Sequence, residues 1–234
     1  MAVAVVLAAG LLGLVAFMRQ SRSEPPLPPA PSVKKPPLEE APPPADPVPG
    51  PPVDLLALVD LQADAIGGIW GRDGGALRTP SSPFGRLQLP YFPPRDYDLK
   101  VVVERVGGKD SLNLGLAQGE RQFQVIIDGK GGEFGGLDMV DRKPFFENMT
   151  TFRQRMLPEG ERRTVLCSVR RWGVRVSVEN QKVVDWRGSY ASLSLFSDWQ
   201  IPERQGLFVG SFSSEFKVHS VELIPFGEGG SRLR

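Results

Sequence analysis

From Tyr97 onward, apolar side chains recur at every second position, and this alternation restricts the fold more than any other feature of the sequence. Residues 97–106 read YDLKVVVERV, with apolar side chains at odd-numbered positions through Val103 and charged side chains at positions 98, 100 and 104. A strand points successive side chains to opposite faces of its sheet. The pattern therefore predicts a strand with one buried face.

The same period recurs along the rest of the chain. A three-strand meander is predicted over residues 164–186, with turns at Trp172-Gly173 and Asn180-Gln181. No window of ten or more residues has the period of an amphipathic helix. Many short strands at spacings of about ten residues predict an all-β fold, a two-sheet antiparallel jelly-roll sandwich. The other expected strands are residues 112–116, 123–127 before an Asp128-Gly129 turn, 206–212 and 215–226.

The chain divides into three parts by composition. Residues 1–18 include the uncharged stretch Ala2 to Phe17, which predicts a transmembrane anchor or signal segment. Residues 19–52 form an expected disordered linker, because Pro25 to Pro52 holds fourteen prolines in twenty-eight residues and no aromatic side chain. Residues 53–234 are the expected β-sandwich domain, long enough for one core. We expect the protein to be membrane-anchored, with its domain outside the cytoplasm.

Charge and residue counts exclude several function classes. The 28 basic and 27 acidic residues nearly balance, so no bulk electrostatic attraction draws the chain to nucleic acid. One cysteine, Cys167, and one histidine, His219, leave no cysteine cluster or multi-histidine metal site. Cys167 alternates with valines and is expected to be a small buried side chain. We expect no cofactor.

Four stretches together resemble the concanavalin A-like lectin/glucanase superfamily, in particular its laminin-G-like and 3-keto-disaccharide hydrolase-like domains. The resemblance covers about Gly68 to Phe226. It is carried by Trp70, by the strand start Tyr97-Asp98-Leu99, by the hairpin 172–180 leading into 183–186, and by the terminal pair 206–210 and 216–223.

The resemblance implies a sandwich that binds or processes carbohydrate on one sheet or on its rim loops. Hydrolase-like members carry a strand of the type Tyr-Glu-x-Gln-x-x-Asp, whereas residues 121–128 here read RQFQVIID. Only Asp128 of the acidic positions is present. We therefore expect no catalytic residue.

Candidate binding residues come from two segments. Sugars stack on aromatic rings, so we select Trp186, Tyr190 and Trp199, which lie in or beside a polar stretch, with core packing as the alternative for each. Asp138 and Asp141 lie in an irregular segment where they could line a rim, with solvated loop carboxylates as the alternative. Calcium on Asp128, Asp138 and Asp141 is weighed on ligand type alone, and we predict no metal site.

The expected function is a membrane-tethered, non-catalytic recognition domain, with carbohydrate as the first ligand class. Two alternatives stay open. One is a saccharide-acting hydrolase of the 3-keto-disaccharide hydrolase-like type, which needs converging carboxylates. The other is a structural protein-interaction domain.

Overall fold

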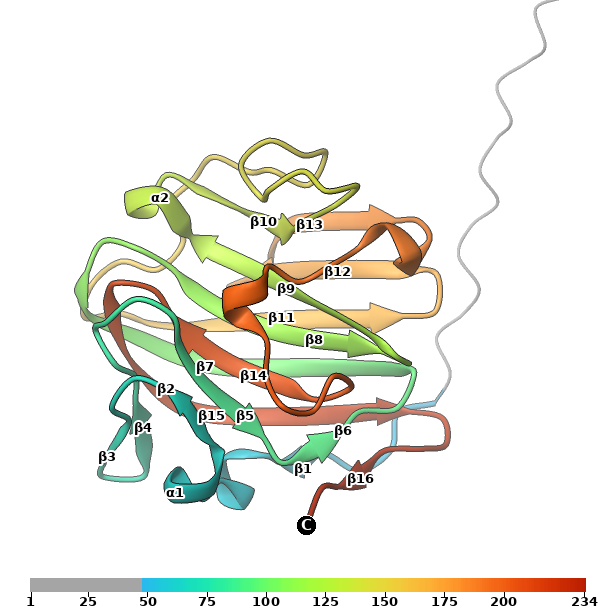
Figure 1. Ribbon diagram of the computed structural model, residues 1–234, viewed down its shortest axis with the longest axis horizontal. Coiled ribbons are helices and arrows are strands. Elements are labelled where there is room, and N and C mark those ends of the chain that lie inside the picture. The colour runs from blue at the N-terminus through green and yellow to red at the C-terminus, as the bar shows by residue number, and fades with distance from the viewer. Residues whose placement is uncertain (1–47) are drawn as a thin grey trace, which may run out of the picture. The chain divides into compact units, whose positions relative to one another are not determined.

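The computed structural model describes residues 48–234, which fold as two antiparallel sheets packed face to face (Figure 1). The predictions for the apolar N-terminal segment and for most of the proline-rich linker lie outside these residues. Within the described part, no helix is long and apolar enough to cross a membrane. Pro49 and Gly50 already pair with the end of the last long strand, through a bridge to Phe226 and a hydrogen bond to Pro225.

Eight strands form the first sheet, called sheet A, in the order β13-β12-β11-β7-β15-β4-β3, with β1 also paired to β15. Its long strands are the ones with the clearest alternation. The bounds are β1 Val53–Asp54, β3 Gly71–Asp73, β4 Ala76–Arg78, β7 Asp96–Gly108, β11 Arg162–Arg170, β12 Gly173–Val178, β13 Gln181–Arg187 and β15 Ser214–Phe226.

Six strands form the second sheet, called sheet B, in the order β10-β9-β8-β14-β5-β2. A third, two-stranded sheet pairs β16 with β6. The bounds are β2 Ala65–Gly67, β5 Gly85–Leu89, β6 Tyr91–Phe92, β8 Leu112–Gln118, β9 Arg121–Asp128, β10 Phe134–Asp138, β14 Leu207–Ser211 and β16 Ser231–Arg232. Every strand pair is antiparallel, so the predicted all-β antiparallel sandwich is confirmed.

The helices are single turns. They are η1 Leu56–Leu58, α1 Leu61–Asp64, α2 Gly129–Gly132, η2 Tyr190–Ser192 and η3 Ser197–Trp199. Two of them, α2 and η3, flank the outer face of sheet B, where the candidate site lies.

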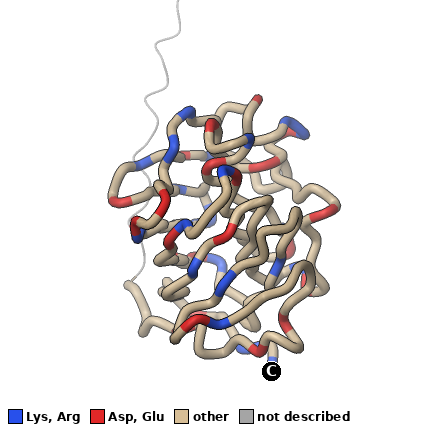
Figure 2. The backbone as a smooth tube through the Cα atoms, turned by 90° about the vertical axis from the view of Figure 1, so that its left-hand side faces the viewer, with Lys and Arg blue, Asp and Glu red and all other residues tan. Residues whose placement is uncertain are grey.

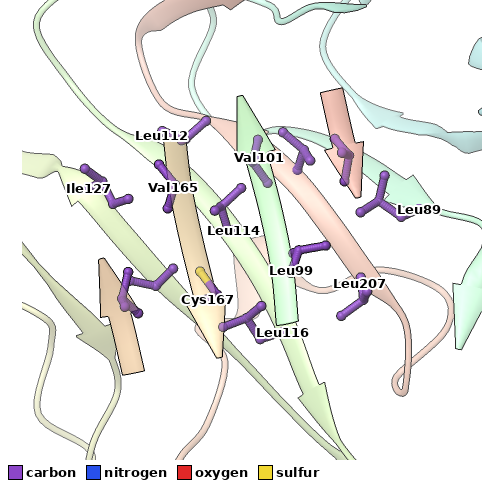
Figure 3. Close-up of a cluster of buried hydrophobic side chains, with 14 of the residues drawn as sticks. Leu89, Leu99, Val101, Leu112, Leu114, Leu116, Ile127, Val165, Cys167 and Leu207 are labelled. Carbon is purple, nitrogen blue, oxygen red and sulfur yellow. The ribbon is translucent and has the colours of Figure 1, made fainter. Parts of the chain in front are cut away.

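The core lies between the two sheets, where the inward residues of β7 and β11 face those of β8 and β9 (Figure 3). Leu99 and Val101 of sheet A and Leu114 of sheet B are fully buried, as the alternation predicted. Cys167 is buried in the same layer, which confirms its expected packing role, and this burial raises the pKa of its thiol.

The predicted meander is confirmed, because β11, β12 and β13 are consecutive neighbours in sheet A. The final pair differs from a simple hairpin. β14 belongs to sheet B and β15 to sheet A, so the chain crosses from one sheet to the other at Phe212 and Ser213. Trp70 is buried, as expected, but lies between β2 and β3 rather than within a strand.

Acidic and basic residues alternate along the fold without gathering in one region (Figure 2). On the outer face of sheet A they form ion pairs, such as Lys100 with Glu222 and Arg175 with Asp185. Such exposed pairs contribute little to stability, and they indicate a solvated face.

Candidate functional site

The outer face of sheet B carries a second, smaller apolar cluster instead of the polar surface that alternation alone would give. It consists of Trp199, Ile201 and Phe208, and partly buried side chains, including those of Phe84 and Phe212, pack against it. The segment between β13 and β14, orange in Figure 1, brings Trp199 and Ile201 to this face. Sheet B is therefore covered by apolar side chains on both faces, and the candidate site lies on the outer one.

Glycines on the outer face let aromatic rings lie flat against sheet B. Gly115 pairs with Phe208 across β8 and β14, and a Cβ at Gly115 would come within 1.9 Å of the Phe208 ring. Trp199 stacks on Phe208 with ring centroids 6.1 Å apart and an interplanar angle of 3°. A Cβ at Gly210 would come within 2.8 Å of Trp199. Because neither glycine has a Cβ, the rings of Phe208 and Trp199 can lie close to the backbone of sheet B.

A cavity of about 490 Å³ opens beside this stack, a size typical of small-ligand sites. Six aromatic side chains line it, together with Ile126, Met139 and Pro144, and the polar residues that line it are described below. The six aromatic residues are Phe84, Phe145, Phe146, Phe196, Trp199 and Phe212. We call this cavity the sheet B pocket.

Phe145 and Phe146 belong to a loop in which the Asn148 side chain makes the largest set of hydrogen bonds. The Asn148 side-chain amide donates hydrogen bonds to the carbonyls of Leu137, Lys143 and Pro144, at 2.8, 3.2 and 2.9 Å. Its Oδ1 accepts from the backbone and hydroxyl of Thr150. These bonds join the loop to β10, so they fix the aromatic wall relative to the sheet.

Asp138, at the end of β10, is a carboxylate of the pocket that is only 5% exposed. Its Oδ2 accepts a hydrogen bond from Gln124 Nε2 at 3.0 Å, and its Oδ1 accepts from the backbone N–H of Phe145 at 3.2 Å. Burial raises the pKa of Asp138, and these hydrogen bonds offset only part of the rise.

Asn113 of β8 adds a second buried polar group to the pocket. Its amide nitrogen donates to Ser111 Oγ at 2.9 Å, while its Oδ1 has no hydrogen-bond partner among the residues described. The side chain is fully buried. An unsatisfied acceptor in such a place costs free energy, so it favours a ligand that brings a donor.

Three further charged residues line the pocket: Lys130, Arg142 and Asp110. Lys130 and Arg142 are exposed. Asp110 is held by backbone amides, with Oδ1 accepting from Ser111 at 2.9 Å and Oδ2 from Gly131 at 3.2 Å. Asp110 thus orders the loop around α2.

Of the five residues predicted from the sequence to bind ligand, the structure brings two together in this pocket, Trp199 and Asp138. Trp199 is itself 4% exposed, because its ring stacks on Phe208. Asp141 does not line the pocket, and its side chain is exposed in the loop after β10.

Trp186 belongs to the main core and the partly buried Tyr190 packs against it, so the expectation of exposed rings there needs correction. Trp186 is in phase with Val184 on β13, and this phase turns it inward, where it is 3% exposed. Tyr190 packs edge to face on Trp186 and donates its hydroxyl to the carbonyls of Arg170 and Gly173. Burial raises the pKa of that hydroxyl.

The acid that the family resemblance left in place, Asp128, is also structural. It forms a fully buried ion pair with Arg105 at 3.0 Å and accepts from the backbone N–H groups of Met156 and Leu157. Within residues 48–234, no three acidic, histidine or cysteine side chains gather as a metal site. Asp128, Asp138 and Asp141 therefore do not form the common site considered from their residue types.

The phenylalanines of the pocket were missed by the sequence reasoning. They come from four separate segments, and none of these has a period that marks a shared surface. The consecutive pair Phe145-Phe146 in an otherwise polar loop is the signal that could have identified one wall.

No protein-family profile matches the sequence, and no curated protein matches it either. Solved structures do share the fold. One is a Bacillus subtilis protein of unknown function with a galectin-like fold, at 10% identity over 76% of this chain and 96% of that one, with a TM-score of 0.53. Another is the Crh5 transglycosylase, at 12% identity over 75% and 84%, with a TM-score of 0.52.

The exoplasmic/lumenal domain of VIP36 bound to Ca²⁺ and Man3GlcNAc is less similar, at 12% identity over 70% and 83% and a TM-score of 0.47. At these identities the likeness shows the fold alone. The chain thus shares its β-sandwich fold with a protein described as galectin-like. The finer laminin-G-like or hydrolase-like resemblance stays a prediction.

Proposed function

We propose that the chain is a non-catalytic recognition domain and that it binds a saccharide ligand in the sheet B pocket. The observation that carries the proposal is the combination of aromatic walls with buried polar acceptors on one sheet face. Asn113 Oδ1 has no partner in the described part of the chain, and Asp138 faces the same cavity. Rings supply stacking area for the apolar faces of a sugar, and acceptors bind its donors.

The fold is compatible with a saccharide ligand. A transglycosylase is among the solved structures that share the fold. The resemblance noted from the sequence also implies carbohydrate. Since a fold hosts many functions, the pocket and not the fold carries the argument.

A glycan array probed with the full chain tests the proposal. Phe196 lines the pocket and is 47% exposed, so Phe196→Ala removes a wall with little effect on folding. Met149 is 79% exposed and does not line the pocket, so Met149→Ala is the matched control. We expect glycan binding that Phe196→Ala weakens about tenfold and Met149→Ala leaves unchanged. No bound glycan, or equal effects of the two variants, contradicts the proposal.

A saccharide hydrolase is the second candidate, and the raised pKa of Asp138 favours it. A general acid needs a pKa above that of an ordinary carboxyl, and glycoside hydrolysis uses two carboxyl groups. The second carboxyl of this pocket, Asp110, has both oxygens engaged by backbone amides. Turnover of a bound glycan that both Asp138→Asn and Asp110→Asn abolish would favour the hydrolase over the recognition domain.

We further propose that the N-terminal segment tethers the domain to a membrane and that the domain lies outside the cytoplasm. The support is the uncharged stretch before Met18 and the proline-rich linker after it. An alkaline phosphatase fused after Arg234 should be active, since this enzyme needs an oxidising compartment. An inactive fusion at normal abundance would contradict the proposed location. From the balance of charges in the sequence, we also propose that nucleic acid is not a partner.

A further inference from the structure

Four aspartates are buried in the described part of the chain, and three of them have a basic partner. Asp138 is the exception, because no ion pair reaches it within residues 48–234. The three pairs are Asp64 with Arg234, Asp96 with Arg171, and Asp128 with Arg105.

The surroundings of Asp138 supply only neutral donors. Gln124 and backbone N–H groups contact its carboxyl oxygens, and burial raises its pKa. A buried carboxylate without a counter-charge costs free energy. Lys130 and Arg142 line the same pocket but are exposed, and neither forms an ion pair with Asp138. Water screens such exposed charges, so the buried carboxylate still lacks a cation.

The wall of the pocket shows that its rings accept an ammonium group. Lys130 Nζ lies 3.5 Å from the centroid of the Phe146 ring, a cation–π contact within this chain. Five further aromatic rings line the same cavity. Aromatic faces around a buried carboxylate form a site for an organic cation.

Asn113 adds an acceptor for the hydrogens of such a cation. Asn113 lines the cavity, and its buried Oδ1 has no partner among the residues described. An ammonium group has three donors and no acceptor. A hydroxyl group would also donate to Asn113, but it would leave the charge of Asp138 uncompensated.

We propose that the ligand of the sheet B pocket carries a protonated amine that binds Asp138, so that the saccharide class is that of amino sugars with a free amino group. The inference rests on the proposed function, because it names the saccharide class of the same pocket. The aromatic walls pack on the apolar faces of the sugar, and the carboxylate selects for its charge. N-acetylation removes that charge, so acetylated sugars should bind weakly.

The test compares two tetrasaccharides that differ only in acetylation, the β-1,4-linked tetramers of glucosamine and of N-acetylglucosamine. Titration calorimetry with the full chain near neutral pH measures the Kd of each. We expect the glucosamine tetramer to bind about 100-fold more tightly, the range measured for close charge pairs at interfaces. This comparison uses the unaltered protein, so it does not depend on whether a variant folds.

Asp138→Asn then assigns the effect to the carboxylate. The variant removes the charge but keeps the shape, and it should lower the affinity for the glucosamine tetramer to that for the acetylated tetramer. Asp141→Asn makes the same chemical change three residues away on an exposed side chain outside the pocket, and it should leave both affinities unchanged.

Equal binding of the two tetramers, or tighter binding of the acetylated one, overturns the inference while leaving saccharide recognition in place. Retained preference for the glucosamine tetramer in Asp138→Asn also overturns it, because a neutral side chain would then suffice. Binding of neither tetramer overturns it too. In that case the glycan array decides whether saccharide recognition itself fails.

Discussion

Arg105 and Asp128 form an ion pair with no solvent-exposed side-chain surface on either partner, with Nη2 and Oδ2 3.0 Å apart. The pair joins β7 of sheet A to β9 of sheet B. Arg105 Nε also donates to the carbonyl of Leu157, and Asp128 accepts from the N–H of Leu157. The end of the loop that follows β10 is thereby anchored between the two sheets.

Removal of one partner of this pair should destabilise the domain strongly. Arg105→Met leaves the Asp128 carboxylate buried without its cation, and we expect a loss of about 3–5 kcal/mol in the free energy of unfolding. Urea denaturation of both proteins measures the difference. Arg105→Met combined with Asp128→Asn should cost less than the sum of the two single changes, since no charge then stays buried. Additive losses would show that the two side chains do not act as a pair.

Gly115→Ala should disturb the floor of the sheet B pocket. The new Cβ would lie 1.9 Å from the Phe208 ring, so this ring and the stacked Trp199 must shift. We expect a loss of about 1–3 kcal/mol in stability, as for other overpacked sites. Gly107→Ala is the matched control, because no atom lies within 4 Å of its new Cβ. Its unfolding free energy should not fall, and should rise by about 0.4–1 kcal/mol, because alanine restricts the unfolded chain.

Asp138→Asn should stabilise the domain at neutral pH while weakening ligand binding. The folded state raises the pKa of Asp138, so proton binding favours folding and ionisation opposes it. The penalty is absent below the unfolded pKa of about 3.9 and appears as the pH rises through the folded pKa. Asparagine cannot ionise and escapes the penalty. Gln124 can rotate its free Oε1 towards the new amide.

Urea unfolding as a function of pH checks this prediction. The variant should be more stable than the parent at pH 7, and the difference should vanish towards pH 3. A constant difference across this range would show that Asp138 does not carry the burial penalty. Gain of stability with loss of binding is the usual relation at a functional site.

Asn148→Asp should loosen the aromatic wall. The substitution replaces an amide that donates to three carbonyls by a carboxylate that repels them. We expect a loss of about 1–3 kcal/mol and faster hydrogen exchange across residues 143–151. Met149→Ala, on the exposed neighbour, should leave the exchange rates unchanged. The same contacts mean that a glycan on Asn148, part of the Asn148-Met149-Thr150 sequon, would have to break them.

Most strands after Tyr97 were predictable because apolar side chains alternate visibly along them. β10, Phe134–Asp138, was missed and its residues from Gly135 on were assigned to an irregular segment; β16 was missed as well. Strands β1 to β6 span two to five residues each, too few to show a period. Sheet membership was not predictable either. β7 and β8 are consecutive strands in different sheets, and a one-dimensional pattern does not distinguish a hairpin from a crossing.

For the site, chemistry identified Trp199 and Asp138 but not their neighbours. Trp186 was selected as a binding residue, but its phase with Val184 on β13 already indicated that its side chain is buried. The phenylalanine walls depend on how loops fold back over sheet B, and this folding is fixed by contacts such as those of Asn148. Such contacts join residues that no local pattern relates.

The long strand of sheet A that comes last in the sequence, β15, lies in the interior of the sheet. β15 lies between β7 and β4, pairing Leu223 with Leu99 and Val218 with Leu77. During translation, β7 therefore has an open edge until β15 has been made, and an open edge is a template for pairing with other chains. A polypeptide that stops at Ser213 would contain every strand of sheet B yet lack the centre of sheet A. Its expected fate is aggregation, not a smaller folded domain.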